Sequence, residues 1–251
     1  MRLQFELDEL GSPVGLPVAS PGPATLPNAD LIVEGAYARL EPLRAEVHGH
    51  QLWEAFGEDR EGRNWTYLGV GPFSSDQEFT GHLSRIAASS DPFFYAIIDK
   101  HSGLAVGYAS YLRIDPNARS IEVGWITYSP RVQRTRVATD SMYLMMRTAF
   151  ELGYRRYEWK CNALNAPSIA AAQRLGFSFE GLFRQALVVK GRNRDSAWFS
   201  VIDGDWPRLR SAFERWLGPD NFDAAGQQRE RLSDLTASVV ASRWPQLVVD
   251  L

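Results

Sequence analysis

Three arginines stand together where a strand pattern gives way to a helix pattern. Arg131, Arg134 and Arg136 fall within six residues, without an acidic residue among them, in a protein of net charge −3. The segment 139–152 that follows has apolar residues at helical spacing. Free N–H groups and the dipole at a helix N-terminus bind anions, phosphates above all. The stretch therefore predicts a pyrophosphate site, and a solvated basic loop is the alternative.

Other chemical signals in the sequence are weak. The four histidines are scattered and Cys161 is the only cysteine, so no metal-ligand spacing is present and no metal site is predicted. Cys161 follows an alternating apolar segment with no histidine nearby, which favours a buried thiol over a nucleophile. Gly69 and Gly71 lack the third glycine and the strand–helix context of a dinucleotide loop. A single cysteine also indicates a reducing compartment.

Composition narrows the class of protein. The 251 residues are 45% hydrophobic and 23% charged, which argues against a wholly disordered chain. No run of about 18 apolar residues is present, and the first ten residues are too acidic for a secretory signal. The small negative net charge gives no general field for nucleic acid. We therefore expect a cytoplasmic protein with no membrane or direct nucleic-acid partner, either a monomer or a homodimer.

The elements that must position these residues alternate between strands and helices, which predicts an α/β fold on a mixed sheet. Five prolines within the first 29 residues predict an extended arm. Ser75 and Glu78 form a capping-box pattern at the start of the second expected helix, and Asn165 is a further expected cap. The expected strands are 38–43, 93–99, 105–114, 120–127 and 155–161, with a hairpin of 177–189 and 194–202. The expected helices are 46–56, 75–88, 139–152, 165–174, 206–217 and 224–242.

Four segments in order resemble the GNAT superfamily of N-acyltransferases: WTYLGVGPF, EVGWITYSPRVQRTRVATDSMYLMM, NALNAPSIAAAQRLGFSFEG and GLFRQALVVKGRNRDSAWFSVI. The resemblance spans roughly 34–206. It is strongest to the branch of bacterial ribosomal-protein N-terminal (alanine or serine) acetyltransferases. It implies a mixed, mostly antiparallel sheet of six or seven strands, splayed in the middle and flanked by helices. The implied organisation is a proline-rich arm at 1–30, the acetyltransferase domain at 31–206 and a helical extension at 207–251.

The resemblance also implies where acetyl-CoA, or another acyl-CoA, would bind. The acyl-CoA enters a gap between the strand ending at Thr127 and the strand ending near Asn162. Arg136 stands at a position where the superfamily loop usually has glycine, which would allow positive φ and close approach of phosphate. The cofactor-binding residues implied are Trp125, Ile126, Thr127, Gln133, Arg134, Thr135, Arg136, Val137, Ala138, Thr139, Asn165 and Ser168.

The implied reaction is direct attack of a primary amine on the thioester. An α-amine has a pKa near ~8 and needs only modest help from a base. Glu122 matches a frequent base position, with its side chain on the face opposite Ile121 and Val123; an exposed strand carboxylate is the alternative. Asn165, besides capping its helix, matches a contact with the pantetheine arm. Ser168 is the candidate proton donor to the leaving thiolate, because Ala172 replaces a tyrosine used by many relatives; an ordinary first-turn serine is the alternative.

The acceptor is less defined. Its candidate contacts are Trp65, Tyr67, Phe73 and Arg184, with core packing as the alternative for the aromatic residues. The basic turn KGRNRD could meet an acidic acceptor or partner, or could be a solvated turn. By family analogy the acceptor is a protein N-terminal α-amine. The alternatives are a small-molecule amine (an amino acid, an antibiotic or a polyamine) and an acyl-CoA-binding protein with little turnover.

Overall fold

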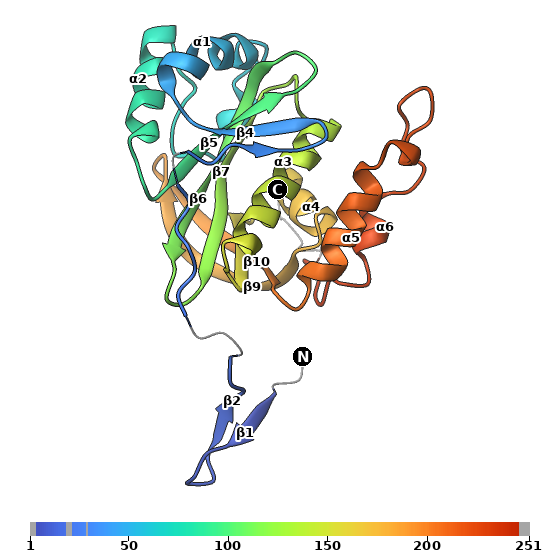
Figure 1. Ribbon diagram of the computed structural model, residues 1–251. Helices are drawn as coiled ribbons and strands as arrows, with labels where there is room; N and C mark the ends of the chain where they lie inside the picture. Colours follow the sequence, from blue (N-terminus) through green and yellow to red (C-terminus); the bar gives the residue numbers. More distant parts are fainter. Residues whose placement is uncertain (1–3, 19–21, 29, 246–251) are drawn as a thin grey trace.

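A twisted sheet runs through the centre of the protein. The computed structural model describes residues 4–18, 22–28 and 30–245, and within them this sheet has eight strands in the order β3-β4-β5-β6-β7-β8-β10-β9 (Figure 1). Neighbouring strands are antiparallel except β7 and β8, which run parallel. The strands are β3 (Val33–Glu34), β4 (Ala38–Pro42), β5 (Phe93–Asp99), β6 (Leu104–Asp115), β7 (Ser120–Tyr128), β8 (Arg156–Asn162), β9 (Ser178–Val189) and β10 (Arg192–Ile202). The expected six or seven strands are too few, because the two residues of β3 add an edge strand to β4.

Helices cover both faces of the sheet. The α-helices are α1 (Ala45–Phe56), α2 (Asp76–Ala87), α3 (Arg136–Glu151), α4 (Ala166–Arg174), α5 (Trp206–Leu217) and α6 (Leu232–Thr236), and two short 3-10 helices are η1 (Arg63–Trp65) and η2 (Pro219–Asn221). A hydrophobic core lies on each face of the sheet, and the side chains of β5 point alternately into the two cores. Ala96 and Ile98 pack with α1 and α2, while Tyr95 and Ile97 pack on the side of α3. Figure 1 shows α5 and α6 beside α3 and α4.

Local capping sets the helix ends. The Ser75 side chain accepts the backbone N–H of Glu78, as predicted, but the Glu78 carboxylate reaches back to Ser74 and not to Ser75. Helix α3 begins at Arg136, three residues before the expected start, because Thr135 Oγ1 accepts the N–H of Ala138 and so acts as its N-cap. The arginines therefore lie directly at the helix start.

The N-terminal arm is not simply extended. Strands β1 (Phe5–Leu7) and β2 (Pro13–Gly15) pair as a small antiparallel hairpin that projects away from the body (Figure 1). The Asp8 carboxylate accepts the N–H groups of Leu10 and Ser12, which fixes the turn. Pro13 stands at the first position of β2, where a proline is tolerated in a strand. Positions 1–3, 19–21 and 29 of the predicted arm lie outside the described residues.

The predicted helix at 224–242 is wrong, since only α6 forms there. Asp223 Oδ1 accepts the N–H groups of Ala225 and Gln227, and Gly226 has φ +76°, so the chain turns where the helix should start. The apolar side of the segment is nevertheless buried, because Leu232 and Val239 join the core beside α5. The division into arm, domain and extension remains a prediction, and the positions 246–251 lie outside the described residues.

None of the described helices combines the length and apolar character needed to span a membrane.

Candidate functional site

Strands β7 and β8 separate halfway along their length. Their parallel ladder runs from Ser120 opposite Arg156 to Val123 opposite Trp159, and ends there. On its other side β7 shifts register against β6, and Trp125 at this irregularity has φ 50°. The backbone of 125–127 therefore has no strand partner on the side of β8.

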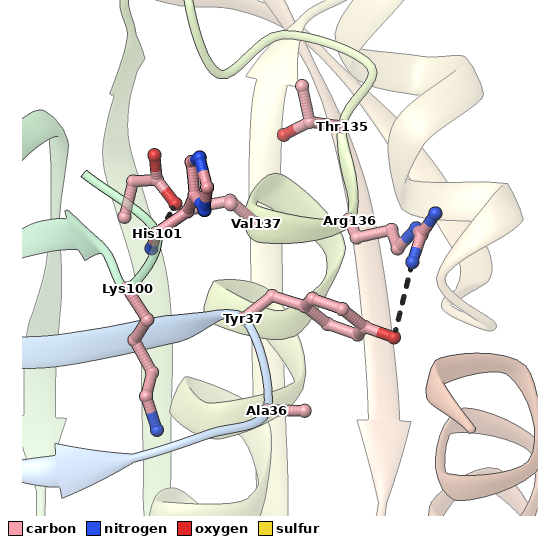
Figure 2. A pocket seen from close by; sticks show the side chains of 8 residues that line it. Ala36, Tyr37, Lys100, His101, Thr135, Arg136 and Val137 are labelled. Carbon is pink, nitrogen blue, oxygen red and sulfur yellow. Dashed lines mark hydrogen bonds between the residues drawn. The ribbon is translucent and has the colours of Figure 1, made fainter. Parts of the chain in front are cut away.

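The N-terminus of α3 lies next to this gap. Its first N–H groups, those of Arg136 and Val137, have no acceptor within the helix. Figure 2 shows the hollow beside them, a cavity of about 440 Å³ that also reaches Tyr37 and the β5–β6 turn. The residues lining it are Ala36, Tyr37, Asp99, Lys100, His101, Thr135, Arg136 and Val137. Exposed N–H groups, a helix dipole and nearby cations suit an anionic ligand.

Arg136 does not turn its side chain toward the loop. Its guanidinium carbon lies 3.9 Å from the ring centre of Phe222 and 5.3 Å from that of Tyr37, whose hydroxyl oxygen is 3.5 Å from Nη1 (Figure 2). As the first residue of α3 it has an ordinary helical backbone, so replacing glycine here causes no strain. The residue of this loop with positive φ is Arg134, at 63°. The Arg136 side chain is thus engaged by Tyr37 and Phe222.

The loop before α3 is fastened to the segment after α1. Gln133 Nε2 donates to Asn64 Oδ1 at 2.7 Å and to the carbonyl of Tyr128 at 3.2 Å, and Asn64 Nδ2 donates to the same carbonyl. Arg131 pairs with Glu58 at 2.7 Å. Gln133 and Arg131 therefore brace the loop, and Asn64 is a contributor that no sequence pattern indicated.

The first turns of α3 pack against the core and are hydrogen-bonded to α4. Val137 and Ala138 are half-buried against the core, and Thr139 is buried. Thr139 Oγ1 accepts a hydrogen bond from Arg174 Nη2 at 3.0 Å. Among the predicted cofactor residues, these three side chains therefore serve mainly to hold α3 in place.

The start of α4 brings Ser168 to the splayed end of β8. Asn165 Oδ1 accepts the N–H of Ser168 at 3.2 Å, which is the predicted cap. The indole Nε1 of Trp159 donates to Ser168 Oγ at 3.1 Å. Cys161 is buried close by, and burial raises the pKa of its thiol to about 11 although the Ser168 hydroxyl lowers it in part. The predicted proton donor is therefore a positioned hydroxyl and not a solvated one.

Glu122 lies on the predicted face but is not an exposed carboxylate. Ile121 and Val123 face the core on the α3 side, and Glu122 itself is only 3% exposed. Its carboxylate lies 2.7 Å from Arg113 Nε and 2.9 Å from Lys160 Nζ. The structure thus excludes the alternative of an exposed strand carboxylate, and it shows that two cations already engage the predicted base.

The ion pairs continue along β8. Lys160 also pairs with Glu158 at 2.7 Å, and its ammonium lies 3.6 Å from the ring centre of Trp198. Although burial alone would raise the pKa of Glu158, the hydrogen bonds from Lys160 and Arg156 lower it overall. Arg156 then forms a two-fold hydrogen bond with Glu180 at 2.9 and 2.6 Å. The ion pairs among Glu122, Lys160, Glu158, Arg156 and Glu180 are here called the β8 ion network. Two of these residues, Glu158 and Lys160, line a groove beside β7.

The predicted acceptor residues lie in three different surroundings. Trp65 is 4% exposed and Phe73 is half-buried against it, so both belong to the core of α1 and α2. Tyr67 instead donates its hydroxyl to the carbonyl of Leu164, at 2.9 Å, which links the segment after α1 to the segment before α4. Arg184 is exposed on β9.

The tip of the β9–β10 hairpin is exposed to solvent but is fastened to the body at Lys190. Lys190 Nζ donates to the carbonyls of Trp65 and Gly71, at 2.8 and 2.7 Å, and so ties the tip to the segment after α1. Together with the Tyr67–Leu164 bond, this contact joins the segment after α1 to the hairpin and to the segment before α4. The sequence pointed to this basic turn but not to its partners. In the described ranges, 4–18, 22–28 and 30–245, no cluster of three or more metal-ligating side chains occurs.

The comparisons with known proteins agree with this arrangement. A family model described as an acetyltransferase (GNAT) domain matches residues 38–178. A GCN5-related N-acetyltransferase from Brucella melitensis is 46% identical, with a TM-score of 0.84 over 86% of this chain and 98% of that one. A GNAT-family protein from Chromobacterium violaceum is 40% identical, with a TM-score of 0.73 over 78% and 98%.

A more distant structure, from Salmonella typhimurium, is an acetyl transferase that modifies the N-terminal serine of a 50S ribosomal subunit protein. It is 20% identical, with a TM-score of 0.59 over 68% of this chain and 99% of that one, and so shares the fold. A search of the curated proteins finds no match.

Proposed function

The chain belongs to the GNAT family of acetyltransferases, and from this premise we propose that it transfers an acetyl group from acetyl-CoA to a primary amine. The observation that carries the proposal is the separation of β7 and β8 past Val123 and Trp159, next to the N-terminus of α3. In this proposal a strand edge, a helix N-terminus and a positioned hydroxyl together form the binding path. This combination suits a long thioester with a charged end better than a compact ligand.

The proposed position of acetyl-CoA follows from the polar groups along that path. The pyrophosphate would accept the free N–H groups at Arg136 and Val137. The pantetheine arm would form strand-like hydrogen bonds with the backbone of 125–127. The thioester would then reach the region of Ser168 and Cys161, where β8 leaves β7.

The proposed reaction needs little from the protein besides placement. The amine nitrogen attacks the thioester carbon, the carbon–sulfur bond breaks, and the sulfur leaves with a proton. Ser168 Oγ accepts a hydrogen bond from Trp159, so the proton that it can donate is its own, which would turn from Cys161 to the leaving sulfur. The surplus proton of the amine passes to water or to Glu122, whose two cationic partners hold it in place, and a proton returns through water to Ser168.

Two acceptor classes remain within this proposal. A protein N-terminal α-amine is the acceptor suggested by family analogy, and its low pKa suits a site whose carboxylate is already paired. A small-molecule amine is favoured by the Tyr67–Leu164 and Lys190–Trp65 contacts, which cross the acceptor side and limit the room for a long peptide.

The first test is calorimetric titration of the protein with acetyl-CoA, with succinyl-CoA and free CoA as comparators. We expect micromolar binding of acetyl-CoA, followed by acetylation in a panel of peptides and small amines read by mass spectrometry. Absence of binding by all three CoA compounds would contradict the proposal. Tighter binding of succinyl-CoA would assign a different acyl group to the same site.

A further inference from the structure

Arg194 is a half-buried cation without a counterion. In the part of the chain that the structure describes, its side chain has neither an ion pair nor a hydrogen bond, and its Nε is fully buried. Three cations on strands β6 and β8 are matched: Arg113 by Glu122, Lys160 by Glu122 and Glu158, and Arg156 by Glu158 and Glu180. A buried charge without a partner destabilises a protein, so the unpaired guanidinium of Arg194 calls for an explanation.

Its position is at the splayed end of the sheet. Ser196 on β10 pairs with Asn162, the last residue of β8, and Arg194 comes two residues earlier, beyond the end of β8. The guanidinium interacts electrostatically with Cys161 and Glu122, and it is repelled by Arg113. Arg194 therefore reaches from β10 toward the place where the thioester and the amine would meet, on the Glu122 face.

The protein supplies no ion pair for Arg194 at this position. Among the described residues, Glu122, Glu158 and Glu180 pair with Arg113, Lys160 and Arg156, and none of the three pairs with Arg194. Asp195, the next residue, uses its carboxylate on the N–H of Gln185 and the amide of Asn193. Burial lowers the pKa of the Arg194 guanidinium, and the attraction of Cys161 and Glu122 offsets this only in part.

In the proposed pose, acetyl-CoA does not supply the anion that would pair with Arg194. Its phosphates lie at the start of α3, and the pantetheine arm separates them from the thioester end where Arg194 lies. The remaining component of the reaction is the acceptor. An anionic group on the acceptor would balance the charge of Arg194 and at the same time orient the amine.

We propose that Arg194 binds a carboxylate of the acceptor, so that the substrate is an amine that carries an acidic group close to the reacting nitrogen. This inference rests on the proposed acetyl transfer and narrows its substrate class. The carboxylate can come from a free amino acid or from an acidic first residue of a peptide. In both cases the guanidinium offers paired donors to two oxygens.

Matched acceptors test this inference. Initial rates are measured for an amino acid against its amide, and for a peptide beginning with aspartate against one beginning with asparagine. We expect the carboxylate-bearing member of at least one pair to be preferred by about tenfold or more in kcat/KM, the usual value of a charge-assisted hydrogen bond. The pair that shows the preference identifies the source of the carboxylate.

The variant R194Q should lose this preference, mainly through a higher KM, while R194K should keep part of it. Acetyl-CoA affinity, measured by calorimetry, should stay within about threefold of the wild-type value in both, as should the affinity of the control R208Q on α5. Equal rates within both pairs for the wild-type protein, or an unchanged preference in R194Q, would overturn the inference while acetyl transfer itself stands. A large loss of acetyl-CoA affinity in R194Q would assign Arg194 to the cofactor instead. Failure to acetylate any amine would overturn the proposed function as well.

Discussion

Trp159 and Ser168 are joined by a hydrogen bond of 3.1 Å from the indole Nε1 to the hydroxyl oxygen. The bond connects β8 to the first turn of α4, across the end of the gap between β7 and β8. Because the oxygen accepts from the indole, the hydroxyl proton points away from Trp159. A strand residue thus orients the hydroxyl that we propose as the proton donor.

Replacing Ser168 by alanine should slow the chemical step. We expect kcat to fall by about 100-fold, the lower end for loss of a general acid, with acetyl-CoA affinity within about threefold of wild type. Steady-state kinetics and calorimetry measure the two effects separately. The variant W159F keeps the hydroxyl but removes its orienting donor, so it should lie between S168A and wild type. A wild-type kcat in S168A would mean that water protonates the sulfur.

Replacing Arg136 by glutamine should affect stability more than cofactor binding. Its side chain packs on Phe222 and Tyr37, so we expect a loss of about 1 kcal/mol in the free energy of unfolding, as for a cation–π contact. Acetyl-CoA affinity should change by less than about threefold, since the backbone N–H remains. Urea unfolding and calorimetry test this. F222L should reproduce the stability loss, and a large loss of affinity in R136Q at normal stability would contradict the assignment.

The Arg156–Glu180 pair should make the protein sensitive to acid. The hydrogen bonds from Arg156 hold the pKa of Glu180 below its ordinary value of 4.5, and burial only partly opposes them. Folding therefore gains stability from this pair above pH 4.5, and loses it as the pH falls through the lower pKa of the folded state.

Urea unfolding at a series of pH values between about 3 and 6 measures this dependence. The slope should be smaller in E180Q. It should be partly reduced in S200A, because Ser200 Oγ also donates to Glu180 at 2.7 Å. An identical slope in E180Q and wild type would show that other carboxylates control acid unfolding.

The Cys161 thiol should react slowly with alkylating reagents in the folded protein. Burial raises its pKa to about 11, so the thiolate that reacts with alkylating reagents is scarce at neutral pH. We expect iodoacetamide to label the native protein at pH 8 at least about tenfold more slowly than the urea-unfolded protein. Mass spectrometry measures both rates. Rapid labelling of the native protein would instead indicate an activated thiol at the end of the gap.

Local patterns in the sequence determined most of the elements. The expected bounds of β5 and α5 coincide with the observed ones, because a continuous apolar run and helical spacing are properties of a few consecutive residues. The caps at Ser75 and Asn165 were equally predictable, since a cap is a bond between neighbours in the chain. The failed helix at 224–242 had its own local signal, Asp223 followed by Gly226, which the apolar spacing beyond it obscured.

Only the tertiary structure decided how the site residues are used. The engagement of Glu122, the direction of Arg136 and the isolation of Arg194 each depend on groups far away in the sequence, such as Lys160 and Phe222. A residue type and a spacing show that a charge is present, but not which charges surround it once strands pair and helices pack. The sequence by itself therefore determined the family, the order of the elements and the path expected for acetyl-CoA. Packing decided which charges are neutralised, because charge balance depends on distance in space and not on distance along the chain.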